Sequence, residues 1–206
     1  MIELVTTQGV FALDGGEWEV TNNIWLVGNE REVLVIDAAH DHQPIVDAVH
    51  GRRVRAIVLT HGHNDHINAA VALSDVTDAP IYLHPADQML WSVVYPDHVP
   101  DHELRDGMVL RAGGAELGVV HTPGHSPGCC CLLNVAGGVV FSGDTLFCGG
   151  PGATGRSYSD FPTIVESIRS TLLTLPPETI VHTGHGDSTT IGAEAPMLDE
   201  WIRRGN

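Results

Sequence analysis

A chain of 206 residues, 43% of them hydrophobic, can bury a full core, and we expect a single domain over residues 1–206. Its net charge of −16, with ten arginines and no lysine, would repel a phosphate backbone, which excludes nucleic acid as a partner. The sequence shows no signal peptide and no apolar run near the roughly 18 residues that span a bilayer, so we expect a cytoplasmic protein without a membrane partner.

Strands and helices alternate in the first half of the chain. Runs rich in β-branched and aromatic residues predict strands over 2–13, 22–38, 55–60 and 80–85. Apolar residues at helical spacing predict helices over 43–49, 67–76 and 86–94. Residues 95–107 hold two prolines and no periodic pattern, which predicts an irregular loop and makes this segment a candidate lid.

The second half begins as a series of antiparallel strands. They are predicted over 108–112, 116–121, 129–135 and 138–142, with hairpin turns at Gly113-Gly114 and Gly137-Gly138. A helix is predicted over 161–175, where Asp160 is the expected cap and Pro162 lies in the first turn. A strand over 179–183 and a helix over 193–204 follow. Two sheets with helices outside make a four-layer α/β/β/α sandwich.

Four cysteines lie at positions 129, 130, 131 and 148. Three are consecutive on a predicted strand, where neighbouring side chains point to opposite faces, so they form no disulfide framework and fit a reducing compartment. We interpret these three as core residues. Cys148 is interpreted as a small apolar residue lining a loop, with a metal ligand or a redox thiol as the alternatives.

The densest chemical signal is the segment Thr60-His61-Gly62-His63-Asn64-Asp65-His66, which directly follows a buried strand. Imidazole and carboxylate together suit Zn²⁺ or Fe²⁺, whereas Mg²⁺ and Ca²⁺ favour oxygen ligands. His61 and His63 project to one side of an extended chain, and Asp65 and His66 turn toward a second position as a helix begins. The segment can therefore serve two adjacent metals. The alternative is that Asp65 only caps the following helix and that the histidines are solvated.

Three further segments repeat one pattern, in which an apolar strand leads through a hydroxyl residue and a glycine to a candidate ligand. They are Thr122-Pro123-Gly124-His125, Ser142-Gly143-Asp144 and Thr183-Gly184-His185. A strand end holds a ligand on rigid backbone, and glycine allows the chain to turn sharply. Each ligand alone has an ordinary explanation as a loop or turn residue. Together they predict a preorganised site.

At these segments the chain resembles the metallo-β-lactamase superfamily, and more narrowly the glyoxalase II-like hydrolases. The resemblance extends over nearly the whole chain and rests on residues 61–66, 122–128, 141–147 and 183–186. It implies that one metal is bound by His61, His63 and His125. It also implies that a second metal is bound by Asp65, His66 and His185, with Asp144 as a bridge.

The resemblance has one departure at the C-terminal end. Residues 186–206 alone follow His185, so we expect the C-terminal helical domain with which glyoxalase II binds glutathione to be absent. The thiol carrier is therefore left open.

Two metal ions that share a hydroxide lower the pKa of water, hold the nucleophile in line with a bound carbonyl and stabilise the oxyanion and the leaving group. Esters, thioesters, amides and lactones all fit such a centre. We predict a metal-dependent hydrolase for a thioester of a small thiol, because thiolate is a good leaving group that Zn²⁺ stabilises, with Asp65 taking the proton. The expected cofactors are two Zn²⁺ ions, or mixed zinc and iron.

The main rival is an iron-dependent persulfide dioxygenase, which resembles the chain at the same segments and uses a single Fe²⁺ held by His61, His125 and Asp144. A lactone, ester or β-lactam hydrolase of the same fold and a non-catalytic binding module are further alternatives. The expected partner of each enzyme is a small-molecule substrate, and the oligomeric state is left open.

Other residues are assigned supporting roles. Asp37, at the end of a buried strand, resembles the family's aspartate that supports the metal loop, and Thr60 and His84 are weaker candidates for the same role. Residues 149–156 lack the Gly-Lys-Ser/Thr ending of a phosphate loop, so we predict an active-site loop there. Arg156 and Tyr158 are candidate substrate-binding residues; Arg156 would pair with a substrate carboxylate, and the alternative is that it is a solvated surface arginine. The histidines interpreted as surface residues are His40, His42, His50, His98 and His102.

Overall fold

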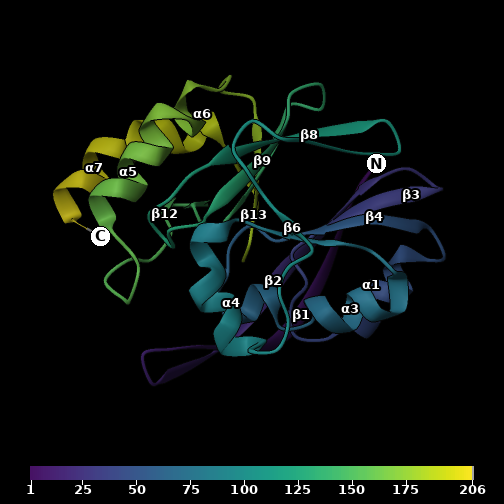
Figure 1. Ribbon diagram of the computed structural model, residues 1–206. Helices are drawn as coiled ribbons and strands as arrows, with labels where there is room; N and C mark the ends of the chain where they lie inside the picture. Colours follow the sequence, from purple (N-terminus) through teal and green to yellow (C-terminus); the bar gives the residue numbers. More distant parts are fainter. Residues whose placement is uncertain (206) are drawn as a thin grey trace.

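The computed structural model describes residues 1–205, and its two β-sheets pack face to face with helices on the outer face of each (Figure 1). The helices on the first sheet are α1 (His42–Val49), α3 (Ala70–Thr77) and α4 (Gln88–Val94). Those on the second sheet are α5 (Phe161–Ser170), α6 (Ile191–Glu194) and α7 (Leu198–Arg204). The predicted four-layer α/β/β/α sandwich is confirmed.

The strands of the first sheet lie side by side in chain order. They are β1 (Ile2–Leu13), β2 (Gly16–Gly28), β3 (Glu32–Ile36), β4 (Arg53–Val58), β5 (Ile81–Leu83) and β6 (His102–Glu103). The first three pair antiparallel, and β3 to β6 pair parallel. Parallel neighbours need a crossover connection, which α1, α3 and α4 supply.

The second sheet has the order β14-β13-β10-β9-β8-β7. Its strands are β7 (Val109–Ala112), β8 (Ala115–His121), β9 (Cys130–Asn134), β10 (Val139–Gly143), β13 (Ile180–Thr183) and β14 (Thr189–Thr190). Only β10 and β13 pair parallel, and α5 forms the crossover between them. A small separate ribbon consists of β11 (Leu146–Phe147) and β12 (Gly150–Pro151).

Strand β3 shows how the sequence builds the layers. Val33 and Val35 pack in the cluster beneath the helices of the first sheet, whereas Leu34 and Ile36 pack in the cluster between the two sheets. Side chains alternate along a strand, so a continuous apolar run buries both faces of its sheet. A third cluster, which includes Val140, Val181, Ile164 and Trp201, joins the second sheet to its helices.

A long hairpin of β1 and β2 extends away from the first sheet, at the lower left of Figure 1. Its turn residues, Asp14 and Gly15, have φ values of 53° and 77°, as a tight two-residue hairpin turn requires. The sequence interpretation began the second strand at residue 22, so it missed residues 16–21 of β2. The Asp-Gly pair is the signal that would have found them.

Three predicted helices are interrupted. The helix predicted over 67–76 is divided into α2 (Asn64–Ile67) and α3, because the backbone N–H of Ala69 donates to the carbonyl of Ala38, 3.0 Å away. The helix predicted over 161–175 ends at Ser170 and continues as a 3₁₀ turn, Leu172–Thr174, before Pro176-Pro177. The helix predicted over 193–204 is divided by a second 3₁₀ turn, Ala195–Met197, because Pro196 has no N–H to donate.

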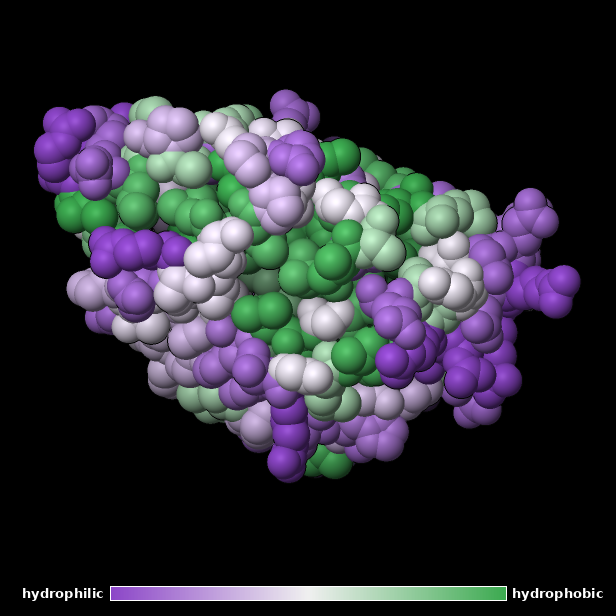
Figure 2. Space-filling view, turned by 90° about the horizontal axis from the view of Figure 1, so that it is seen from above, coloured by the Kyte–Doolittle hydropathy of each residue, from purple (hydrophilic) through white to green (hydrophobic). Residues whose placement is uncertain are grey.

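The surface has both polar and apolar regions. Seen from above, hydrophobic residues gather toward the middle of the visible face and hydrophilic residues toward its two ends (Figure 2). Within residues 1–205, no helix has the length and apolar character needed to cross a membrane.

The inter-sheet cluster predicts a large effect of Leu117→Ala. Leu117 is fully buried on β8, so its truncation should lower the free energy of unfolding by about 2–5 kcal/mol. Val135→Ala is the matched control, because Val135 is 78% exposed and its truncation should change stability by less than about 0.5 kcal/mol. Urea denaturation of the metal-free proteins measures both. Equal losses would place Leu117 outside the core.

Candidate metal centre

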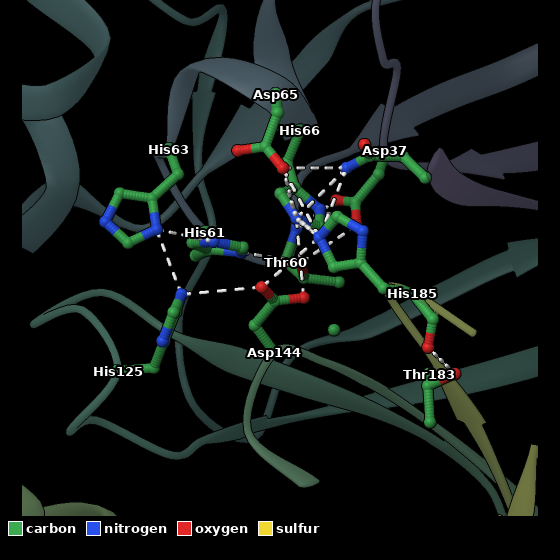
Figure 3. Close-up of polar contacts among 12 residues, drawn as sticks. Asp37, Thr60, His61, His63, Asp65, His66, His125, Asp144, Thr183 and His185 are labelled. Carbon is green, nitrogen blue, oxygen red and sulfur yellow. Dashed lines mark hydrogen bonds and ion pairs between the residues drawn. The ribbon is translucent and has the colours of Figure 1, made fainter. Parts of the chain in front are cut away.

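Imidazole and carboxylate groups meet at one edge of the two sheets (Figure 3). Strands β8 and β10 both run antiparallel to β9, and β10 is parallel to β13, so the C-terminal ends of these three strands lie at the same edge. His125, Asp144 and His185 follow those ends, and residues 61–66 follow β4 of the other sheet. The structure thus brings together all the residues predicted as metal ligands: His61, His63, Asp65, His66, His125, Asp144 and His185.

Three buried histidines form the first set of donors. The Nδ1 atom of His63 lies 3.0 Å from His61 Nε2 and 3.0 Å from His125 Nε2. Nitrogen ligands at about 2.0–2.1 Å from a tetrahedral zinc ion are about 3.3 Å apart, so these nitrogens are spaced nearly as an ion requires. Burial lowers the pKa of His63 to about 3, with the neighbouring His125 adding to the effect, and burial also lowers the pKa of His61. Neutral imidazoles are the form that binds metal.

Asp65, His66 and His185 form a second set. The Nε2 atoms of His66 and His185 lie 3.1 Å apart, and Asp65 Oδ2 lies 3.3 Å from His185 Nε2. Burial alone would raise the pKa of Asp65, but the positive charge of His66 together with the hydrogen bonds to His185 and Asn22 lowers it to about 2. Burial alone would lower the pKa of His185, but the negative charge of Asp144 together with the hydrogen bonds to Asp144 and Asp65 raises it to about 10. The lowered pKa of Asp65 and the raised pKa of His185 both mean that this set of groups favours positive charge at its centre.

The carboxylate of Asp144 lies between the two sets. Its Oδ1 atom is 3.4 Å from His66 Nε2, and its Oδ2 atom is 3.5 Å from the Nε2 atoms of both His125 and His185. Three buried atoms of the cluster, His63 Nε2, Asp65 Oδ1 and Asp144 Oδ1, have no hydrogen-bond partner among residues 1–205. Orphaned buried donors and acceptors are costly, and metal ions between the two sets would give the carboxylate oxygens partners. The residues present fit a two-metal centre.

Asp37 contacts His66 of the second set, and Thr60 in turn contacts Asp37. Asp37 Oδ2 lies 2.9 Å from His66 Nδ1, and the two Asp37 oxygens accept hydrogen bonds from the Thr60 backbone N–H (2.7 Å) and hydroxyl (2.9 Å). Such outer partners orient a metal-binding imidazole. His84, predicted for the same role, lies elsewhere, where it stacks on His121 at 4.1 Å and accepts a bond from the Ala86 backbone.

Sequence reasoning missed Asn22, which is fully buried on β2. Its Nδ2 atom donates to Asp65 Oδ2 at 3.0 Å, and its Oδ1 atom lies 2.8 Å from His40 Nε2. The interpretation of His40 as a surface residue is therefore wrong, because this half-buried imidazole contacts the residue that holds Asp65. The polar pair Asn22-Asn23 lies inside β2, next to its apolar run 24–27, but no local pattern indicates the partner of Asn22, which lies 43 residues away.

Asp87 is a second residue that sequence reasoning missed. Its carboxylate is fully buried and accepts hydrogen bonds from the Gly62 and Gly128 backbones and from the Ser126 hydroxyl. Burial raises the pKa of Asp87, and these three bonds partly offset the rise. No sequence signal marked it, because it follows a proline in a short polar segment.

A pocket of about 270 Å³ opens over the metal-ligand candidates. Its apolar walls come from the β1–β2 hairpin, from β11 and from the loop after β12, and they include Phe11, Leu13, Trp18, Val20, Phe147 and Ala153. The predicted role of residues 149–156 as an active-site loop agrees with this position. Residues 95–107, proposed as a lid, contribute nothing to the walls that the structure describes; within this segment His102–Glu103 pair with β5 as β6.

The two candidate substrate-binding residues differ in position. The Arg156 guanidinium lines the pocket and stacks over the rings of Trp18 (3.7 Å) and Phe11 (5.3 Å). Tyr158 is 55% exposed and is not part of the pocket wall. Of the cysteines, 129 to 131 are buried, as predicted for core residues, and Cys148 is exposed, with its role still open.

Comparison with known proteins gives a family. The family model described as the metallo-beta-lactamase superfamily matches residues 18–185. The protein named hydroxyacylglutathione hydrolase GloC of Haemophilus influenzae is 30% identical over 187 residues, which cover 83% of this chain and 87% of that protein. The protein named probable metallo-hydrolase YqgX of Bacillus subtilis is 32% identical and covers 84% of this chain and 88% of its own length.

Solved structures agree with the sequence relatives. The BLEG-1 B3 metallo-beta-lactamase superposes with a TM-score of 0.79 at 31% identity, covering 93% of this chain and 97% of that one. The di-iron-bound form of TTHA1623 superposes with a TM-score of 0.77 at 35% identity, covering 85% and 93%. One of these similar proteins is named as a β-lactamase and another as a hydroxyacylglutathione hydrolase, and one structure is described as di-iron-bound.

The position of Asp144 predicts that Asp144→Ala loses metal from both sets. Protein purified without added metal should contain about two ions per chain, and the variant at most about one, because neither set keeps the shared carboxylate. Elemental analysis of the folded proteins measures this. Asp199→Ala, at an exposed position on α7, is the control and should keep the full content. Unchanged metal in Asp144→Ala would contradict a bridging role.

Proposed function

Because the chain belongs to the metallo-β-lactamase superfamily, we propose that it is a metal-dependent hydrolase that cleaves a thioester of a small thiol. One observation carries this proposal: two sets of metal donors share the Asp144 carboxylate at the base of an apolar pocket. The name of the similar GloC protein supports the thioester class.

The expected ions are two Zn²⁺, or zinc mixed with iron. Imidazole and carboxylate donors suit both metals, and the similar TTHA1623 has a di-iron-bound form. His61, His63 and His125 would hold one ion, Asp65, His66 and His185 the other, and Asp144 would contact both. When bound, such ions supply Lewis acidity toward a carbonyl oxygen and a water of lowered pKa.

We infer that Asp65 accepts the proton of the attacking water. Asn22 and His185 hold its Oδ2 atom, at 3.0 and 3.3 Å, whereas its Oδ1 atom has no partner among residues 1–205, and Asp65 lines the pocket. The pKa of about 2 keeps this carboxylate ionised at neutral pH. A fixed, ionised carboxylate beside the substrate can act as a general base.

The pocket wall and Arg156 set the expected substrate. Phe11, Trp18 and Phe147 would enclose an apolar acyl group and exclude water from the reacting carbonyl. The Nη1 atom of Arg156 is buried without a hydrogen-bond partner in the described chain, although the guanidinium is fixed by the rings beneath it. A guanidinium in this state favours a substrate that carries a carboxylate.

The second candidate function is the persulfide dioxygenase with one Fe²⁺. His61 lies within one group of possible ligands with His125 and within another with Asp144, and His125 Nε2 and Asp144 Oδ2 are 3.5 Å apart. This function leaves Asp65, His66 and His185 without a task, which is why we favour the hydrolase. A lactone, ester or β-lactam substrate would use the same two-metal centre, and the similar BLEG-1 protein is named as a β-lactamase.

The test is a panel of small-thiol thioesters, a lactone, a β-lactam and a persulfide, each assayed with and without O₂ on protein of known metal content. We expect anaerobic thioester cleavage with release of free thiol, at a rate that follows metal occupancy. Protein stripped by a chelator is the control and should be inactive until metal is restored. Oxygen uptake with the persulfide, together with no thioester cleavage at full loading, would leave the dioxygenase in place of the hydrolase.

The role of Arg156 predicts a selective loss in Arg156→Gln. For a thioester with a carboxylate, kcat/KM should fall about 10- to 100-fold, the effect of one charge-assisted hydrogen bond, while the matching neutral methyl ester should change little. Arg169→Gln is the control, because Arg169 is exposed on α5 and pairs only with Glu166. An equal loss on both thioesters would instead assign Arg156 a packing role against Trp18.

A further inference from the structure

Asp87 lies between the two loops that carry the three-histidine set. Its Oδ2 atom accepts hydrogen bonds from the Gly62 N–H (2.7 Å) and the Ser126 hydroxyl (2.6 Å), and its Oδ1 atom accepts one from the Gly128 N–H (2.6 Å). Gly62 separates His61 from His63, and Ser126 directly follows His125. One buried carboxylate therefore binds the backbone between His61 and His63, and the Ser126 side chain and Gly128 backbone that follow His125.

The two loops close tightly on this carboxyl group. A methyl group on Gly62 would begin 2.9 Å from the Asp87 Cβ atom, and one on Gly128 would begin 2.6 Å from the Asp87 Cγ atom. Neither glycine can therefore carry a side chain while Asp87 occupies this space. The separation of the loops is set by the size and position of one side chain.

The three donors require a carboxylate. An asparagine has one acceptor oxygen and one NH₂ group, so at least one backbone N–H would face another donor at about 2.7 Å. A buried N–H without an acceptor costs more free energy than its hydrogen bond contributed. The loop that carries this N–H would therefore move away from the side chain at position 87. Asp87→Asn therefore keeps the volume of the side chain and changes the distance between the two ligand loops.

The second donor set has no contact with Asp87. His66 is held by Asp37, Asp65 by Asn22, and His185 Nδ1 lies 2.8 Å from the carbonyl oxygen of Thr21. These partners come from strands of the first sheet and the segments that directly follow them, not from the 85–87 turn. A change at Asp87 therefore acts on one set of donors.

We propose that Asp87 is a positioning residue that fixes the distance between the His61–His63 loop and the His125 loop, and thereby the affinity of the three-histidine set for its metal ion. The inference rests on the proposed two-metal centre. Loss of an outer partner of this kind typically weakens metal binding 10- to 100-fold, and we expect about that effect in Asp87→Asn. The ion at Asp65, His66 and His185 should keep its affinity.

The experiment titrates Zn²⁺ into the metal-free full chain against a chromophoric chelator. Wild type should bind two ions tightly, and Asp87→Asn one tightly and one about 10- to 100-fold more weakly. Circular dichroism of the metal-free proteins checks that each is folded. Glu194→Gln is the matched control: Glu194 is also a buried carboxylate that accepts a backbone bond, from Gly149, but it touches neither ligand loop, so both ions should bind normally.

A double-mutant cycle identifies the affected ion. In a His185→Ala background, which weakens the second set, Asp87→Asn should still weaken the remaining ion 10- to 100-fold. In a His125→Ala background, Asp87→Asn should have no further effect. The d–d spectrum of bound Co²⁺ should change with Asp87→Asn in the first background only.

Several results would overturn the inference. Wild-type affinity for both ions in Asp87→Asn, equal weakening of both, or an effect that persists in His125→Ala would each do so. A wild-type chain that binds one ion would contradict the two-metal centre, but Asp87→Asn must still weaken that ion if the three histidines hold it. Should Asp87→Asn not fold, Ser126→Ala removes one of the three bonds and should lower the affinity for the same ion about fivefold. An unchanged affinity in Ser126→Ala would then contradict the positioning role of Asp87.

Discussion

The structure depends on burying several ionisable groups together at one point. A charged group removed from water costs several kcal/mol unless it is paired. Here His185 Nε2 lies 3.3 Å from Asp65 and 3.5 Å from Asp144, so each charge is offset by a neighbour. Because protons and metal ions compete for the same donors, the charge of the cluster and its metal content are linked. The surrounding strands hold these groups close enough for protons and metal ions to compete for the same donor atoms.

The repeated hydroxyl-glycine-ligand pattern has a steric cause. A side chain on Gly184 would begin 2.3 Å from Asp144 Oδ1, and one on Gly143 would begin 2.5 Å from the hydroxyl oxygen of Thr60. Gly143 also has φ of 50°, a conformation that other residues adopt at a cost. These glycines let the strand ends of the second sheet approach the metal loop of the first. At Gly143 and Gly184 the pattern therefore reflects close packing around the candidate ligands, whereas a side chain on Gly124 would begin 2.3 Å from the backbone nitrogen of Ile164 on α5.

Local signals were enough to predict the layers and to collect the candidate ligands, because each ligand lies within a few residues of a strand end. Asp87 and Asn22 could not be found in this way, since they bond to residues 25 and 43 positions away. The division of α2 from α3 likewise depends on a contact with Ala38 that no periodicity reports. The Asp14-Gly15 turn was a local signal that went unused. The single domain and the ligand roles of the clustered residues stay predictions.

The candidate metal donors and most of the apolar pocket wall come from different parts of this fold. The donor atoms stand on strand ends and on α2, whereas the apolar pocket walls come from the β1–β2 hairpin, β11 and the loop after β12. The hairpin and this loop are joined to each other by the bond from the Ser157 N–H to Asp14 (2.9 Å) and by the stacking of Arg156 on Trp18. The hairpin also contacts the segment that carries the candidate donors, because the Ala12 N–H donates to Asn64 Oδ1 and Asn22 donates to Asp65 Oδ2. Since one scaffold can host many reactions, we expect substitutions in the loop after β12 to change substrate preference with less effect on the donors than substitutions in the hairpin.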